Sequence, residues 1–199
     1  MPTAMRKQIM IGPEDHGRRM SLDQFDRAIS RDGQLFELNQ GVIEMVDVPH
    51  PRHSGQVESV REQLTVYKVA HPGVICRISA GMENKILVAS AQSERHPDLS
   101  VYFSPPPEVE DVWSLWVPRI VIEVVSPSSA KRDYDDKPDE YLEFGIDEYW
   151  IVDAQRQQMT ANTRWRGQWK RKIVKGSQKY TTTQLPGFSL DLARVFSAR

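Results

Sequence analysis

The sequence predicts one α/β domain, and three of its segments carry that prediction. Residues 119 to 125 (RIVIEVV) are apolar except for one glutamate, which is typical of a strand buried on both faces of a covered sheet. A helical stretch then ends at Gly145, a suitable C′ residue. The apolar run EYWIVD follows as a second buried strand. A strand, a helix and a strand in this order favour parallel neighbours in the centre of one sheet.

The other elements follow from periodicity and from turn residues. Ser21 is a suitable N-cap for a short helix that ends at Asp32-Gly33. The runs QLFEL and VIEMV flank Asn39-Gln40-Gly41 and predict a β-hairpin. Apolar residues recur at intervals of three and four from about 53 to 67, so we expect a long helix with His53 on its inward face. Further strands are expected at VICRIS, NKILVA and PDLSVYF.

The last third of the chain is basic. Residues 154 to 190 contain no acid and 8 Lys and Arg, whereas residues 1 to 153 carry 26 acids against 16 Lys and Arg. Alternating runs around Arg166-Gly167-Gln168 predict a second hairpin. If strand spacing holds through the turn, each strand has a basic face and an apolar face. The basic residues Arg164, Arg166, Lys170 and Lys172 all stand at even-numbered positions.

Such a basic face suggests contact with a polyanion, so we expect these four residues to bind nucleic acid. The alternative interpretation is a solvated strand face whose positive charge offsets the acidic part of the chain. The sequence leaves both interpretations open.

The length of 199 residues fits a single domain, with residues 1 to 20 as an N-terminal arm. No stretch approaches the roughly 20 apolar residues that cross a bilayer, and the N-terminus lacks the apolar core of a signal peptide. We therefore expect a cytoplasmic protein without a membrane partner. Cys76 is the only cysteine, which excludes an internal disulfide and a multi-cysteine zinc site.

Glu123 is the most informative residue because it stands inside an apolar strand. A buried carboxylate needs a compensating partner or takes up a proton. Asp98 begins another predicted strand and offers a second carboxylate from the same sheet. Two carboxylates with water and phosphate oxygens suit Mg²⁺, with Mn²⁺ as an alternative. The other interpretation is that Glu123 pairs with a buried Lys, Arg or Tyr for structure alone.

Lys137 is the candidate cationic partner, because it lies at helical spacing from Tyr134 and Tyr141. Pro138 would interrupt that helix unless the regular helix begins near Lys137, where proline is tolerated. Residues 129 to 136 are then expected as a loop or a separate turn. Lys137 would face the sheet from the beginning of the helix.

Several motifs along the chain carry a family resemblance. They are Phe-Glu-Leu at 36 to 38, Gly41 through Met45, His53, HPDLSV at 96 to 101, VIEVVSPS at 121 to 128, Arg132-Asp133, Lys137, Tyr141, GIDEYWIVD at 145 to 153 and Leu185-Pro-Gly-Phe. With these motifs, most of the chain from about residue 20 resembles the Uma-two family of restriction-endonuclease-like proteins.

This resemblance implies a restriction-endonuclease-like fold, a three-layer α/β/α arrangement with a mixed central sheet and an additional β-hairpin region. It also implies a PD-(D/E)xK site, in which Asp98 matches the aspartate and Glu123 the second acid. The motif lysine should stand two residues after Glu123, where this chain has Val125. The resemblance implies that the following helix supplies the lysine, here Lys137.

The sequence therefore predicts a metal-dependent endonuclease that hydrolyses phosphodiester bonds of DNA. In this hypothesis Asp98 and Glu123 bind Mg²⁺, and Lys137 positions the attacking water or neutralises developing charge. His53 either hydrogen-bonds into the site or is a satisfied buried histidine. Glu37 and Glu58 are candidates for an additional ligand, although Glu58 lies off the apolar stripe of its helix.

The rival hypothesis is a catalytically inactive module with the nuclease fold, which Val125 at the lysine position favours. Such a module would bind nucleic acid or a protein partner. The sequence does not distinguish DNA from RNA. A homodimer is expected by analogy with the superfamily, because two-fold symmetry helps an enzyme to cut both strands of a duplex.

Overall fold

The structure is a computed structural model that describes residues 8 to 198. Its largest sheet has six strands in the order β12-β11-β10-β9-β8-β5. Their bounds are β5 (Arg77–Ser79), β8 (Leu99–Tyr102), β9 (Ile120–Val124), β10 (Glu148–Asp153), β11 (Gln158–Trp165) and β12 (Gln168–Lys175). β9 and β10 are parallel, as the strand, helix, strand order predicts, and β9 lies inside the sheet. The other neighbours are antiparallel, so the sheet is mixed.

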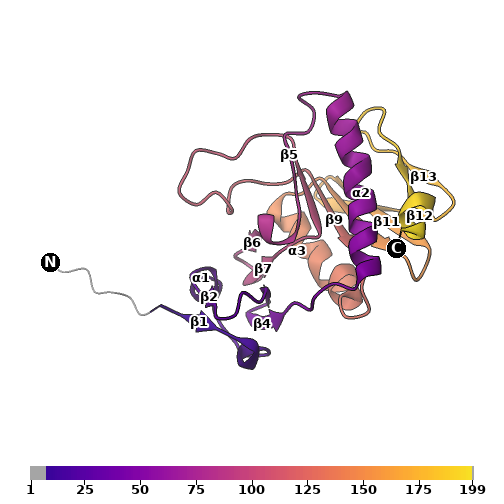
Figure 1. Cartoon of the computed structure of the whole chain (residues 1–199). Helices are drawn as coiled ribbons and strands as arrows, with labels where there is room; N and C mark the ends of the chain where they lie inside the picture. Colours follow the sequence, from indigo (N-terminus) through magenta and orange to yellow (C-terminus); the bar gives the residue numbers. More distant parts are fainter. Residues whose placement is uncertain (1–7, 199) are drawn as a thin grey trace.

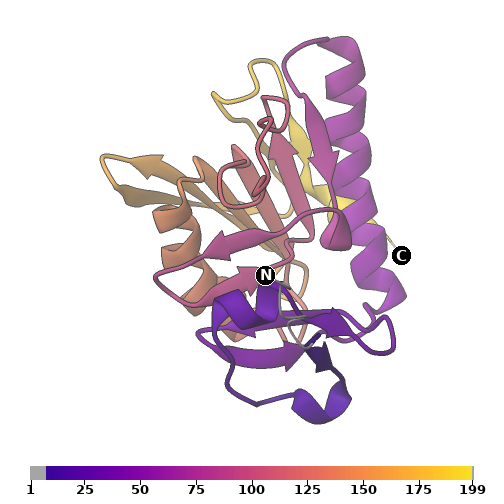
Figure 2. The same ribbon diagram turned by 90° about the vertical axis from the view of Figure 1, so that its left-hand side faces the viewer.

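Helices cover both faces of this sheet. The views in Figure 1 and Figure 2 show α2 (Pro51–Ala70) on one side and α3 (Lys137–Phe144) on the other. The predicted three-layer α/β/α fold is thus confirmed. No helix within residues 8 to 198 is both long enough and apolar enough to cross a membrane.

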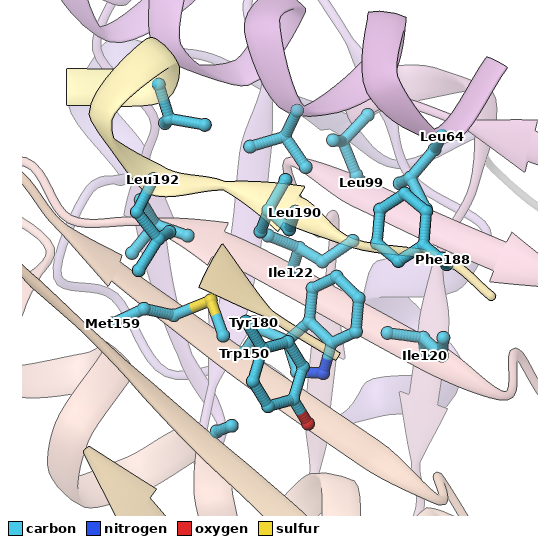
Figure 3. Packing of buried hydrophobic residues seen from close by; sticks show 14 of the residues in the cluster. Leu64, Leu99, Ile120, Ile122, Trp150, Met159, Tyr180, Phe188, Leu190 and Leu192 are labelled. Atoms are coloured by element: carbon cyan, nitrogen blue, oxygen red, sulfur yellow. The ribbon is translucent and has the colours of Figure 1, made fainter. Parts of the chain in front are cut away.

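The main hydrophobic core lies between α2 and the sheet (Figure 3). A short C-terminal helix, α4 (Leu192–Ser197), packs beside α2 and completes the cover of this face. The buried side chains include Leu64, Leu99, Ile122, Trp150 and Leu190. Because successive side chains of a strand point to opposite faces, Ile122 faces α2 and Glu123 faces α3. Removal of this apolar surface from water is the main source of stability.

A second sheet of four strands lies beside the first (Figure 2). Its strands are β3 (Phe36–Asn39), β4 (Val42–Met45), β6 (Ile86–Val88) and β7 (Ser93–Arg95). The predicted hairpin is confirmed as β3 and β4, joined by Gln40 and Gly41 with φ of 49° and 77°. Two positive φ values are typical of a type I′ turn. The strand β7 was not predicted, because Ser-Glu-Arg has no apolar pattern.

The N-terminal residues are packed against this smaller sheet. Residues 1 to 20 were predicted to form an arm, and residues 1 to 7 lie outside the described part of the chain. Residues 8 to 20 instead contribute β1 (Met10–Ile11) and a short 3-10 helix, η1 (Pro13–Asp15). Ile11 and Met20 are buried in one cluster with the side chains of β3. This segment is therefore part of the fold, because its apolar residues have a core to enter.

The remaining elements are short. The helix predicted after Ser21 is α1 (Leu22–Asp26), which ends earlier than expected because β2 (Ile29–Ser30) pairs with β1. A 3-10 turn, η2 (Gly81–Glu83), connects β5 to β6. β13 (Lys179–Tyr180) pairs with β14 (Leu190–Asp191) next to α4.

Candidate active site

A cleft of about 790 Å³ lies where the two sheets and the beginning of α2 meet. Its lining includes Glu37 from β3, His53 from α2, Asp98, Glu123 from β9 and Lys137 from α3. Apolar residues such as Val48, Pro49 and Pro127 line other parts of it. The structure thus brings together Asp98, Glu123, Lys137 and His53, the four residues predicted from the sequence to form one site.

The two carboxylates lie side by side because of the register of their strands. β8 and β9 are antiparallel with Leu99 opposite Ile122, which places Asp98 opposite Glu123. The Asp98 Oδ2 atom accepts a hydrogen bond of 2.8 Å from the Val124 amide. Glu123 Oε2 accepts a longer one of 3.4 Å from the Asp98 amide. Backbone groups of adjacent strands therefore hold both acids in place.

Glu123 is 4% exposed and has two partners at one oxygen. Its Oε1 accepts a hydrogen bond of 2.6 Å from the Tyr141 hydroxyl and lies 2.9 Å from Lys137 Nζ. Burial raises the pKa of Glu123 to about 8, while the charge of Lys137 opposes this shift. The compensating cation expected for this buried acid is therefore Lys137.

Lys137 is also buried, and it donates a 2.8 Å hydrogen bond to Asp133 Oδ1. Burial alone would lower the pKa of Lys137, but the charges of Asp133 and Glu123 raise it above its usual value. The second oxygen of Asp133 accepts a 2.6 Å hydrogen bond from the Ser129 hydroxyl. Sequence reasoning assigned no role to Asp133, although its i, i+4 spacing from Lys137 signals the pair.

Lys137 reaches the sheet because a wider π-helical turn comes directly before it. Residues 129 to 136 were predicted to be a loop or a separate turn, whereas Arg132–Asp136 form a π-helical turn that continues into α3. The Lys137 amide donates to the Arg132 carbonyl, five residues earlier. Pro138 explains this geometry, because proline has no N–H and its ring would clash with the carbonyl four residues before it.

His53 lies in the first turn of α2 and connects that helix to both strands. Its Nε2 atom is 2.9 Å from the Val124 carbonyl oxygen and 3.3 Å from Asp98 Oδ2. Burial would lower the pKa of His53, but its hydrogen bond with Asp98 and the charge of that acid raise it. Its Nδ1 atom is enclosed and has no hydrogen-bond partner within residues 8 to 198.

Of the two additional acids considered from the sequence, only Glu37 enters the cleft. Its Oε1 accepts a 3.0 Å hydrogen bond from the His96 amide, and its Oε2 lies 3.5 Å from the buried Arg95. Burial would raise the pKa of Glu37, but the charges of Lys137 and Arg95 lower it. Glu58 is exposed on α2 and is not part of the lining.

The acids fit a cation that needs few protein ligands. Within the described chain, no three His, Cys, Asp or Glu side chains are arranged to hold a metal ion. Asp98 and Glu123 offer two carboxylates, and the Asp98 side chain is 24% exposed in the cleft. Mg²⁺ and Mn²⁺ accept carboxylate oxygens, and Mg²⁺ usually keeps several waters. A zinc site with three or four protein ligands does not fit these residues.

The predicted second hairpin is confirmed, but its basic residues do not share one face. β11 and β12 pair with Arg164 opposite Trp169 and with Ala161 opposite Lys172. Opposite residues of an antiparallel pair point to the same side of the sheet. Arg164 therefore shares a face with Trp169, and Lys170 and Lys172 point to the other side. Strand spacing does not hold through the turn as the prediction required, because the two-residue turn pairs even-numbered residues with odd-numbered ones.

This hairpin also holds α3. Arg164 Nε donates a 2.8 Å hydrogen bond to the Ile146 carbonyl, and its guanidinium also contacts the Leu142 carbonyl near the end of α3. Trp169 Nε1 donates a 2.8 Å hydrogen bond to the Pro138 carbonyl. None of Arg164, Arg166, Lys170 and Lys172 lines the cleft. The hairpin thus supports the helix that carries Lys137.

Comparisons with known proteins agree with this fold. A solved structure of a putative nuclease from Anabaena variabilis, belonging to DUF820, is similar with a TM-score of 0.70 and 21% sequence identity. The match covers 89% of this chain and 98% of the Anabaena chain. A comparison with curated proteins found no match. The model of the Uma2 family, described as putative restriction endonuclease, matches residues 22–193. The chain therefore belongs to the Uma2 family of putative restriction endonucleases.

Proposed function

We propose that the protein is a metal-dependent endonuclease that hydrolyses phosphodiester bonds of DNA. The observation that carries this proposal is the pair of adjacent carboxylates, Asp98 and Glu123, with the Lys137 ammonium group 2.9 Å from Glu123. Membership of a restriction endonuclease family supports nuclease activity. The cleft gives a DNA strand access to these groups, since Asp98 is partly exposed there.

In this proposal Asp98 and Glu123 hold Mg²⁺ or Mn²⁺. When bound, the ion would polarise the scissile phosphate and lower the pKa of the attacking water. Lys137 stays protonated because Asp133 and Glu123 both raise its pKa. Its positive charge lies beside the acids and stabilises negative charge that develops on the phosphate. Asp133 is a positioning residue, because it holds the ammonium group through a 2.8 Å bond.

His53 is proposed to position Asp98. Asp98 uses Oδ2 in its contacts with both His53 and the Val124 amide, and Oδ1 takes part in no hydrogen bond with the described residues. This arrangement leaves Oδ1 for a cation. A change at His53 should therefore weaken metal binding without removing either ligand.

Contact with the DNA outside the cleft is assigned to Arg166, Lys170 and Lys172, which are exposed on the hairpin. Phosphate contacts of this kind bind without reading sequence. Arg164 contributes less to this surface, because its guanidinium contacts carbonyls at the end of α3. A homodimer and a cytoplasmic location remain predictions, which light scattering and cell fractionation would test.

The first test is titration calorimetry with Mg²⁺ and Mn²⁺ on the wild type and Glu123→Gln, with nicking of supercoiled plasmid measured on the same samples. We expect the wild type to bind the ion and to nick, and Glu123→Gln to lose both. Glu58→Gln is the matched control, since Glu58 is exposed outside the cleft, and it should behave as the wild type.

Absence of metal binding and nicking in the wild type would contradict the catalytic proposal. If that inactive wild type still bound DNA in a salt-dependent way, the non-catalytic module would replace it. RNA in place of DNA in the same assay tests the choice of nucleic acid.

A further inference from the structure

Gln56 lies three residues after His53 on α2 and lines the same cleft. Gln56 is buried, with 3% of the residue exposed. The amide nitrogen is enclosed, yet it has no hydrogen-bond partner within residues 8 to 198. A buried donor therefore stands at the wall of the cleft without an acceptor.

An unsatisfied buried donor destabilises the folded state, so native structures rarely keep one without a reason. Gln63, further along α2, shows how this helix satisfies a glutamine. Its Oε1 accepts a 2.8 Å hydrogen bond from the Asp191 amide, and its Nε2 donates to the Ser59 carbonyl at 3.2 Å. The difference between the two glutamines is that Gln56 borders the cleft.

The groups around Gln56 favour an anion. α2 has 20 residues and begins at the cleft, so the positive end of its dipole points there. Arg52 lines the cleft and forms no ion pair with any residue between 8 and 198. The helix dipole and the Arg52 guanidinium both attract negative charge.

We infer that the first two turns of α2 bind a phosphate group of the substrate strand, with Gln56 as the amide donor. This phosphate neighbours the scissile one, because His53 contacts Asp98 from the same turns. The inference deepens the proposed nuclease function and rests on it for the identity of the strand. The chemistry of the subsite itself requires only a phosphate.

An ordered water is the competing occupant of this position. A water would satisfy the Gln56 amide whether or not a phosphate is present. It would also leave the affinity for phosphate unchanged when Gln56 is replaced. The two occupants therefore differ in a binding measurement.

The experiment titrates ¹⁵N-labelled protein with thymidine 3′,5′-bisphosphate in the absence of metal and follows the side-chain NH₂ signals. The Gln56 signal is assigned by its absence in Gln56→Met, a variant of similar shape. We expect this signal to shift in the wild type, and we expect Gln56→Met to bind the bisphosphate at least about fivefold more weakly with an unchanged or higher Tm. Gln56→Glu should bind more weakly still, because it adds a negative charge.

Three results would overturn the inference. They are an unshifted Gln56 signal at saturation, wild-type affinity in Gln56→Met, and an equal shift with thymidine, which carries no phosphate. The Gln56 signal is also absent in Gln56→Glu, so the signal can be assigned and the first result obtained even if Gln56→Met folds poorly. Glu58→Gln, an exposed change on the same helix, should bind as the wild type does.

Metal-dependent nicking tests the nuclease proposal separately from the phosphate subsite. Glu123→Gln should lose metal-dependent nicking and keep metal-free binding of the bisphosphate. If the wild type does not nick but the Gln56 variants still weaken phosphate binding, the subsite stands and the catalytic proposal falls.

Discussion

Glu123 and Lys137 form an ion pair in which both side chains are 5% exposed. Burying such a pair adds little stability compared with well-packed apolar residues, but removing one partner is costly. The Tyr141 hydroxyl and Asp133 add hydrogen bonds to the pair. The proposed cation site beside the partly exposed Asp98 accounts for this group of buried charges.

Metal affinity is predicted to rise with pH. Burial raises the pKa of Glu123 to about 8, and only the ionised carboxylate binds a cation. The affinity for Mg²⁺ should increase by roughly tenfold per pH unit below that pKa and level off above it. Calorimetric titrations between about pH 6 and 9 measure this profile. A flat profile would mean that Glu123 is not a ligand.

The raised pKa of Glu123 also makes folding without metal depend on pH. The pKa of Glu123 is higher in the folded chain than in the unfolded one, so its protonation favours folding. That contribution is present at low pH and is lost as the pH rises through about 8. Glu123→Gln removes this titration, and its unfolding free energy should depend less on pH in that window.

Lys137→Met is predicted to destabilise the protein by about 3–5 kcal/mol, because it leaves Glu123 and Asp133 buried without their cation. Added Mg²⁺ should then raise the Tm of this variant more than that of the wild type, since the ion replaces part of the lost charge. Lys131→Met is the control, because Lys131 is exposed just before the π-helical turn. If Mg²⁺ raised the Tm of Lys137→Met and Lys131→Met equally, the ion would bind away from Glu123 and Asp133.

At the scale of elements, apolar periodicity predicted those helices and strands whose formation depends mainly on burial of their apolar side chains. The central strands and α2 follow directly from their buried side chains. The π-helical turn before α3 could not be predicted. It arises because Pro138 cannot continue a regular helix, while contacts with the sheet hold the helix in place. The faces of the β11–β12 hairpin depended on the number of residues in its turn, which alternation does not reveal.

Arg164→Ala is predicted to lower the unfolding free energy by roughly 1.5–3 kcal/mol, since hydrogen bonds from a charged group to carbonyls of the α3 end are lost. Because α3 carries Lys137, nicking should fall as well. Denaturant unfolding checks this loss. Lys170→Ala on the neighbouring strand is the matched control and should change stability by no more than about 0.5 kcal/mol.

For DNA affinity we predict that changes at Lys170 and Lys172 have larger effects than a change at Arg164. Lys170→Ala and Lys172→Ala remove exposed charges on β12, and each should lower the salt dependence of binding by about one phosphate contact. Fluorescence anisotropy at several salt concentrations measures these slopes. Unchanged slopes in both variants would favour the alternative of a solvated strand face.

At the scale of the whole molecule, the cleft depends on two sheets. The larger sheet supplies Asp98 and Glu123, and the smaller one supplies Glu37. The acids of the larger sheet could be predicted because Glu123 interrupts an otherwise apolar strand and Asp98 begins a neighbouring one. The burial of Glu37 could not be predicted in the same way, since it arises from contacts with distant segments, whereas the i, i+4 spacing of Asp133 and Lys137 is visible in the sequence.

The smaller sheet should need the N-terminal segment that packs on it. Ile11→Ala is predicted to cost about 2–5 kcal/mol, because Ile11 is 4% exposed in that core. Met10→Ala is the control, since its neighbour Met10 is 42% exposed. Thermal unfolding of both variants tests the packing, and equal small effects would restore the arm predicted from the sequence.

The placement of Lys137 on a helix has a consequence for how such sites can diverge. The acids belong to strands and the amine belongs to α3, so separate mutations can change the acids and the amine. Val125, two residues after Glu123, also lines the cleft. A lysine introduced there in a Lys137→Met background would return the amine to the strand, and recovered nicking would show that one active centre tolerates two evolutionary origins for the same charge.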